Sequence, residues 1–235
     1  MKVIIKDSFE EMSKTATEIF LGTLQQDKRV NISTTAGATP ELMYKMIIDQ
    51  LDDSKYDNVH YYTFDGSSEM GDNKRTIDHL NDALFDHINI DESNIHELRP
   101  DNIDEIQEIL TNSGDLDLMV IGMGEDGHFC GNMPYATDFL KPIYTFSADK
   151  SMPWYDTILW MVNNEEENIP KKMVTMGAPT LMKAKHLVLI VNGEKKAEAV
   201  KKFMNSEVTI EFPASVLKLH PNFTVILDKD AANLL

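Results

Sequence analysis

Leu116-Asp-Leu-Met-Val-Ile-Gly-Met-Gly-Glu-Asp-Gly-His128 is the stretch that decides the fold: a largely apolar run ends in glycines and then in a carboxylate and an imidazole. Such a run predicts a buried strand whose carboxyl end lies at an edge of a sheet, where catalytic groups are often placed. Asp126 can orient His128 and stabilise its cationic form, as a general acid or base requires near neutral pH. We therefore expect catalytic chemistry in the loop after this strand.

Short aliphatic and β-branched runs alternate with helical patterns along the whole chain. The predicted strands are 3–5, 30–33, 59–64, 116–121, 186–191 and 223–227. Between them, apolar residues recur three and four positions apart, which is typical of helices packed on one face. Because apolar strands that alternate with helices form parallel sheets, we expect an α/β fold: a doubly wound, mostly parallel, Rossmann-like sheet with helices on both faces, as a single domain over residues 1–235.

Charge and composition limit the partners. A net charge of −17 argues against nucleic acid, because phosphate backbones are repelled by an acidic surface. The single cysteine, Cys130, allows no internal disulfide and fits a reducing compartment. The N-terminus is too short an apolar run for a signal peptide, and no stretch of about 18 apolar residues predicts a membrane span. We expect a cytoplasmic protein without a membrane or nucleic-acid partner.

Two loops after predicted strands carry groups suited to an anion. Small residues and hydroxyls between Thr34 and Thr39 would let backbone amides reach a phosphate at a helix N-terminus, although any tight turn into a helix favours them. Thr39 is also expected to cap the helix that Pro40 begins. Lys195 and Lys196 open another helix, where they oppose its dipole. Lys196 is the better placed to bind a phosphate, and two solvated surface lysines are the plain alternative.

Asp65 directly follows the predicted strand 59–64, and a carboxylate there faces the ligand crevice of a parallel sheet. A loop or capping aspartate is the alternative for an isolated Asp-Gly. The Thr34–Thr39 loop, Asp65, the Asp126–His128 pair and the two lysines each follow a predicted parallel strand. They should therefore lie at the same edge of the sheet and form one site that holds an anion, a base and an acid/base pair.

The sequence offers no pattern for a metal or an organic cofactor. The other six histidines have no paired spacing typical of metal ligands. The chain contains neither a P-loop nor a dinucleotide glycine signature after its first strand. We expect that the chemistry needs no metal and no cofactor.

The chain resembles the glucosamine-6-phosphate deaminase/6-phosphogluconolactonase family over most of its length. Residues 122–134 look like the deaminase pattern G-x-G-x-D-G-H-I-x-F-N-E-P, and their first half also matches lactonases. Further similar segments are Gly37-Ala-Thr-Pro40, Phe85-Asp-His-Ile-Asn-Ile90, Lys195-Lys-Ala197 and Pro213-Ala-Ser-Val-Leu-Lys-Leu-His-Pro221. The resemblance implies an enzyme that acts on a small-molecule sugar phosphate and is closer to the deaminase branch.

The resemblance also implies a role for each candidate residue. Asp65 falls where the deaminase has the base that moves a proton between C1 and C2 of the opened sugar. Asp126 and His128 fall on the pair that opens the pyranose ring. The phosphate-holding positions fall on Gly37, Ala38, Thr39 and Lys196.

The chain departs from the family pattern at several positions. Met133 stands where the family has a glutamate that assists the ring-opening histidine, and Gly66 follows Asp65 in place of a glutamate. The serine-tyrosine segment is replaced near Arg75-Thr76, and the phosphate-gripping arginine has no clear match in Thr157-Ile-Leu-Trp-Met161.

Three functions stay open on these residues. The leading one is isomerisation, with or without loss of ammonia, of an amino-sugar 6-phosphate of the glucosamine or galactosamine type. The second is a 6-phosphogluconolactonase in which His128 activates water against a lactone. The third is a non-catalytic sugar-phosphate sensor. The sequence leaves open the oligomeric state, and whether the aromatic residues Trp154, Tyr155 and Trp160 are core or lid.

Overall fold

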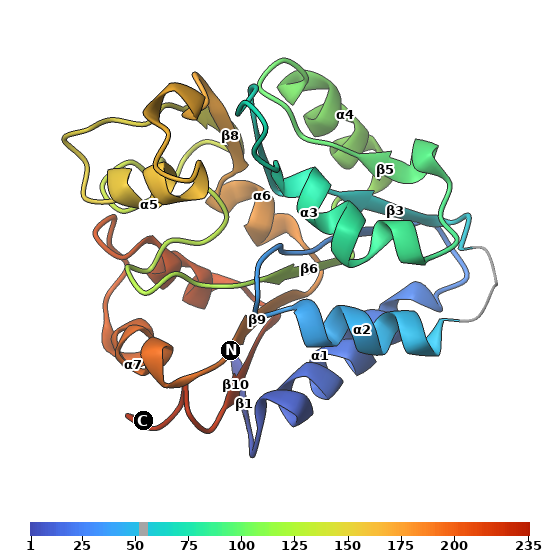
Figure 1. Ribbon diagram of the computed structural model, residues 1–235. Helices are drawn as coiled ribbons and strands as arrows, with labels where there is room; N and C mark the ends of the chain where they lie inside the picture. Colours follow the sequence, from blue (N-terminus) through green and yellow to red (C-terminus); the bar gives the residue numbers. More distant parts are fainter. Residues whose placement is uncertain (52–55) are drawn as a thin grey trace.

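A parallel sheet forms the centre of the computed structural model, which describes residues 1–51 and 56–235 (Figure 1). Within these ranges the sheet has seven strands in the order β1-β10-β9-β6-β2-β3-β5, and every pairing is parallel. Its strands are β1 (Lys2–Lys6), β2 (Val30–Ser33), β3 (Val59–Tyr62), β5 (Ile95–His96), β6 (Leu118–Ile121), β9 (Leu187–Val191) and β10 (Phe223–Asp228). The predicted doubly wound α/β sheet is confirmed.

Helices cover both faces of this sheet because its central strands are apolar on both sides. Leu118 and Val120 of β6 pack in one cluster, and Met119 and Ile121 in the other, as the two-residue period of a strand requires. The helices of the described chain are α1 (Phe9–Leu24), α2 (Glu41–Gln50), α3 (Thr76–Ala83), α4 (Ile103–Ser113), α5 (Tyr155–Met161), α6 (Ala178–Lys183) and α7 (Ala197–Asn205). Helices α1, α2 and α3 supply the first cluster, and α4, α6 and α7 the second.

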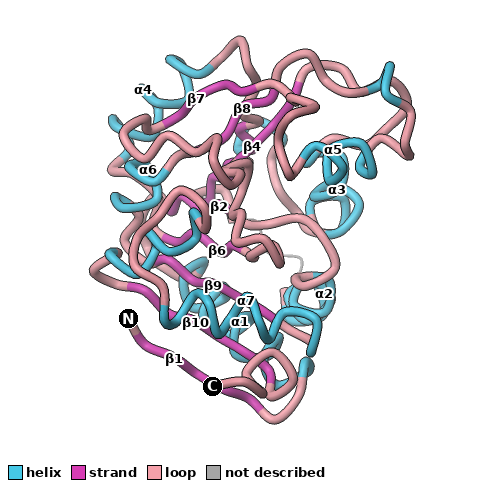
Figure 2. Tube along the Cα trace, turned by 90° about the vertical axis from the view of Figure 1, so that its left-hand side faces the viewer, coloured by secondary structure: helices cyan, strands magenta, loops and turns pink. Residues whose placement is uncertain are grey.

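A second, antiparallel sheet was not predicted from the sequence. It has the order β4-β8-β7, with β4 (Asp65–Ser67), β7 (Ile143–Phe146) and β8 (Met173–Met176), and it lies at the end of the molecule away from β1 (Figure 2). The predicted strand 59–64 therefore ends at Tyr62, and Asp65 begins a strand of the second sheet.

Asp117 interrupts the apolar run that predicted the strand 116–121, and the strand begins after it, at Leu118. The carboxylate is buried, accepts a hydrogen bond from the backbone of Asn31 and pairs with Lys28 and Lys185 at 2.5 and 2.8 Å. Burial alone would raise the pKa of Asp117, but these partners hold it below its ordinary value. The contacts of Asp117 thus connect the starts of three neighbouring strands, β2, β6 and β9.

The aromatic residues of segment 154–160 divide between core and surface. Trp154 is buried with Met133, Ile158 and Met173, whereas Trp160 is 73% exposed on α5. Within the described ranges, no helix combines the length and the apolar character that crossing a membrane demands.

Candidate active site

The loop after β6 brings Asp126 and His128 together, as the sequence predicted. Oδ1 of Asp126 lies 2.6 Å from Nδ1 of His128 and accepts the backbone N–H of the same residue at 3.0 Å. Burial would raise the pKa of Asp126, yet the hydrogen bonds and charge of His128 lower it below its ordinary value. An ionised Asp126 therefore holds Nδ1 as an N–H donor and leaves Nε2 of His128 available for proton transfer.

Two glycines make this geometry possible. A Cβ at Gly124 would lie 2.2 Å from Nδ1 of His128, so any side chain there would displace the imidazole. Gly127 has φ +86°, and a Cβ on it would lie 2.2 Å from the ring of Phe212. Close contacts therefore require glycine at both positions, and a left-handed backbone requires it at Gly127 as well.

Asp65 lies near enough to His128 for the charge of the imidazole to influence it. Burial raises the pKa of Asp65 to about 6, opposed by a hydrogen bond from Thr76 and by the charge of His128. Cys130, in the left-handed backbone region with φ +48°, lies close enough for the charge of Asp65 to add to the effect of burial and raise the thiol pKa. The geometry thus assembles a carboxylate that titrates near neutrality, an imidazole and a neutral thiol.

The predicted anion loops are joined by a hydrogen bond. The Thr39 hydroxyl donates to Oδ1 of Asn192 at 2.8 Å. The expectation that Thr39 caps the following helix is wrong: α2 begins at Glu41, after an N-cap at Pro40 that makes no side-chain bond. The Thr39 hydroxyl instead bonds a residue of another loop. Asn192 follows β9, and β6 lies between β2 and β9 in the sheet. The bond therefore spans the carboxyl end of β6.

Lys196 is half-buried and lies near the acidic residues of the loop after β6. Burial lowers its pKa, and the charges of Glu125 and Asp126 oppose that shift. Lys195 beside it is exposed. The loop that carries Lys196 is fixed at Gly193, whose N–H lies 3.0 Å from both carboxylate oxygens of Asp228.

The structure brings most, but not all, of the predicted residues together. A hydrogen bond joins His128 to Asp126, and the charges of this pair influence the pKa values of Asp65 and Lys196 on either side. Gly37 and Ala38 are exposed beside Thr39, and no hydrogen bond joins either to another candidate within the described ranges. Gly37 has φ +100°, a conformation that favours glycine.

Sequence reasoning missed Thr76 and Asn192, each of which bonds a predicted site residue. Asn192 directly follows a correctly predicted strand, so the strand-end rule that selected Asp65 could have selected it as well. Thr76 carried no such signal.

Met133, near the end of the loop after β6, lies among apolar side chains. Its side chain is buried against Trp154, Ile158 and Met173. The preceding residue, Asn132, donates to the backbone carbonyl of Met176 at 2.8 Å and anchors the loop to the small sheet.

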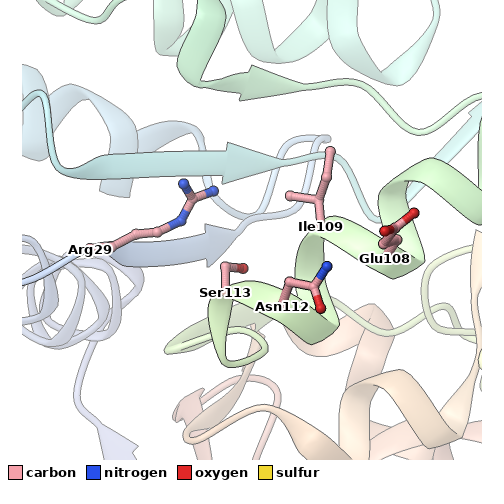
Figure 3. A pocket seen from close by; sticks show the side chains of 5 residues that line it. All are labelled: Arg29, Glu108, Ile109, Asn112 and Ser113. Carbon is pink, nitrogen blue, oxygen red and sulfur yellow. The ribbon is translucent and has the colours of Figure 1, made fainter.

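A shallow depression of about 410 Å³ lies apart from these groups (Figure 3). Arg29, which precedes β2, and residues of α4 and its C-terminal end line it. Since the candidate catalytic residues follow strands, this depression lies at the opposite edge of the sheet. Among the residues that the structure describes, no three His, Cys, Asp or Glu side chains form a group that could hold a metal ion.

Known proteins match this chain along its whole length. A family model for glucosamine-6-phosphate isomerases/6-phosphogluconolactonase matches residues 6–226. A glucosamine-6-phosphate deaminase of Thermoanaerobacter pseudethanolicus is 32% identical over 247 residues, which cover 100% of this chain and 95% of that protein. Glucosamine-6-phosphate deaminase 1 of Bacillus subtilis is 28% identical and covers 100% of this chain and 99% of its own length.

Solved structures agree with the sequence matches. A monomeric glucosamine-6-phosphate deaminase superposes with a TM-score of 0.81 at 28% identity over 100% of both chains. A 6-phosphogluconolactonase from Trypanosoma cruzi gives 0.74 at 17% identity, covering 100% of this chain and 96% of its own, and shows the shared fold alone.

Proposed function

The chain belongs to the glucosamine-6-phosphate isomerase/6-phosphogluconolactonase family, and from that membership we propose that it isomerises and deaminates an amino-sugar 6-phosphate. Asp65 is the proton shuttle, and His128, oriented by Asp126, is the ring-opening acid and base. Thr39, the amides of Gly37 and Ala38, and Lys196 hold the phosphate.

The observation that carries this proposal is that the Asp126–His128 pair lies near enough to Asp65 for the charge of His128 to influence the pKa of Asp65. A carboxyl group whose pKa is about 6 is ionised at neutral pH, yet it is a stronger base than an ordinary aspartate. That is the property required to remove a proton from carbon beside a carbonyl or imine. The nearby imidazole can exchange protons with the sugar oxygens.

The proposed reaction has three steps. First, Nε2 of His128 takes the proton from O1, the C1–O5 bond breaks, and the same proton passes to O5, which opens the ring to an aldehyde. Second, Asp65 removes the proton from C2 while O1 takes a proton from the ammonium group of the substrate, which gives an enolamine. Asp65 then returns its proton to C1, which leaves a protonated ketimine at C2. Third, water adds to C2 and ammonia leaves, so the product is a ketose 6-phosphate.

The buried position of Met133 favours a second candidate, a 6-phosphogluconolactonase. The Met133 side chain packs in an apolar cluster, at the position where the family has a glutamate. This position therefore supplies no carboxylate to assist His128. Hydrolysis of a lactone needs no such assistance, because His128 and Asp126 can activate a water molecule against the carbonyl carbon. Asp65 would then have no proton to move at carbon.

The two reactions separate in a parallel assay with glucosamine 6-phosphate, galactosamine 6-phosphate and 6-phosphogluconolactone. We expect ammonia release that Asp65→Asn and His128→Ala both abolish, while the exposed control Asp49→Asn leaves it intact. If Asp65→Asn still hydrolyses the lactone and neither amino sugar releases ammonia, the deaminase proposal is wrong and the protein is a lactonase. Binding of all three compounds without turnover would identify a sensor.

A further inference from the structure

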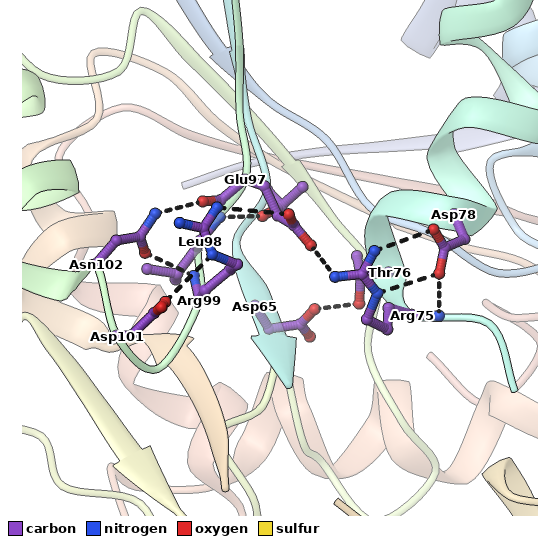
Figure 4. Close-up of polar contacts among 10 residues, drawn as sticks. Asp65, Arg75, Thr76, Asp78, Glu97, Leu98, Arg99, Asp101 and Asn102 are labelled. Atoms are coloured by element: carbon purple, nitrogen blue, oxygen red, sulfur yellow. Dashed lines mark hydrogen bonds and ion pairs between the residues drawn. The ribbon is translucent and has the colours of Figure 1, made fainter. Parts of the chain in front are cut away.

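Thr76 contacts the proposed base directly. Its hydroxyl donates to Oδ1 of Asp65 at 2.5 Å (Figure 4). Within the described ranges, Oδ2 of the same carboxylate accepts no hydrogen bond. The two oxygens of Asp65 are therefore in different surroundings, one held by a protein donor and the other left for a reacting group.

Thr76 is held in place by the start of α3. Arg75, which precedes it, donates its backbone N–H to Oδ2 of Asp78 at 2.9 Å, which closes the first helical turn. The Arg75 guanidinium lies 2.8 Å from Oε1 of Glu97, and Arg99 approaches the other oxygen of Glu97 at 3.7 Å (Figure 4). The N-terminus of α3 is thus tied to the segment after β5 by charged side chains.

The backbone of Asp65 is fixed from the opposite side. A Cβ on Gly66 would lie 2.0 Å from the carbonyl oxygen of Leu98, so β4 presses against the segment that also carries Glu97. The N–H of Leu98 donates to Thr63 at 2.8 Å. Residues 97–99 therefore contact both the strand that carries Asp65 and the start of the helix that carries Thr76.

We propose that Thr76 is a positioning residue that fixes the Asp65 side chain so that Oδ2 faces the sugar carbon. The inference rests on the proposed function, in which Asp65 is the base that removes a proton from the sugar carbon. A donated hydrogen bond stabilises the ionised form, so the same contact also limits how far burial raises the pKa of Asp65.

The test compares Thr76→Val, which keeps the shape and removes the donor, with Thr76→Ser, which keeps the donor. The carboxyl carbon of Asp65 is titrated by 13C NMR, with the signal assigned by its loss in Asp65→Asn. We expect Thr76→Val to raise the Asp65 pKa by about one unit and Thr76→Ser to leave it near the wild-type value. Thermal denaturation of both variants confirms that they are folded.

Activity supplies the second readout. In Thr76→Val we expect kcat at pH 7 to fall about tenfold to a hundredfold with KM nearly unchanged, and the acidic limb of the kcat profile to move to higher pH. An unchanged carboxyl titration in folded Thr76→Val overturns the inference, whatever the activity. If the wild-type protein releases no ammonia, the proposed function fails, and the carboxyl titration still decides whether Thr76 holds Asp65.

Discussion

Thr39 and Asn192 join two loops whose strands are not neighbours, and their hydrogen bond crosses the carboxyl end of the strand that carries the catalytic loop. The bond therefore connects the proposed phosphate-holding segments to each other. It also shapes the space above β6 in which the phosphate would lie.

Loss of this contact should weaken substrate binding more than the chemical step. We expect Asn192→Ala and Thr39→Val each to raise KM by about twofold to tenfold with little change in kcat, since a hydrogen bond of this kind contributes about 1 kcal/mol. Steady-state kinetics of the double variant provide the check. Additive effects would show that the two side chains act separately; the shared bond predicts that the second change costs little after the first.

Lys196 should govern affinity for the phosphate group, and its neighbour should not. We expect Lys196→Ala to weaken binding of a sugar phosphate by about tenfold or more, because a charged hydrogen bond contributes about 1.5–3 kcal/mol. The matched control is Lys195→Ala, which removes an exposed lysine one position away. Calorimetric titration with the substrate distinguishes the two variants, and equal affinities would disprove the proposed phosphate site.

The raised pKa of Asp65 predicts a pH dependence of turnover. A base must be ionised, so kcat should be high above pH 6 and fall as the pH drops through the Asp65 pKa of about 6. The substrate phosphate also ionises near pH 6, so its effect must be separated by measuring kcat at saturating substrate. A kcat that stays constant down to about pH 4.5 would contradict the assignment of Asp65 as the base.

Asp65 should also lower the stability of the fold at neutral pH. Its folded pKa lies above the unfolded value, so the folded state binds the proton more tightly, and stability falls as the pH rises from about 4 to about 6. We expect Asp65→Asn, which keeps an acceptor for Thr76, to raise the free energy of unfolding by about 2 kcal/mol at pH 7.5.

Urea denaturation measures this gain, and it should vanish at pH 4, where the wild-type carboxyl is protonated. The control Asp49→Asn, at an exposed position, should change stability little at either pH. A gain that is equal at the two pH values would have a cause other than the charge of Asp65.

The sequence predicted the large sheet well because its central strands are buried on both faces. Runs such as Leu187–Val191 then leave an unbroken apolar signal, whereas the three-residue strand Asp65–Ser67 is partly exposed and leaves none. Asp65, Asp126 and His128 were found because they follow such runs.

Thr76 was missed for a different reason. It lies eleven residues from Asp65, and its position depends on contacts with Glu97 that no local pattern carries. Asp117 was also overlooked inside an apolar run, because its partners Lys28 and Lys185 come from distant segments.

The apolar cluster around Met133 constrains how this chain could diverge from its relatives. A glutamate introduced at this one position would bring a charge among the apolar side chains of Trp154, Ile158 and Met173, which offer it no hydrogen bond to a cation. Several neighbours would have to change in concert before the new side chain could turn toward the sugar. The difference at this position therefore depends on the packing of its neighbours, and a change to glutamate there alone should cost stability.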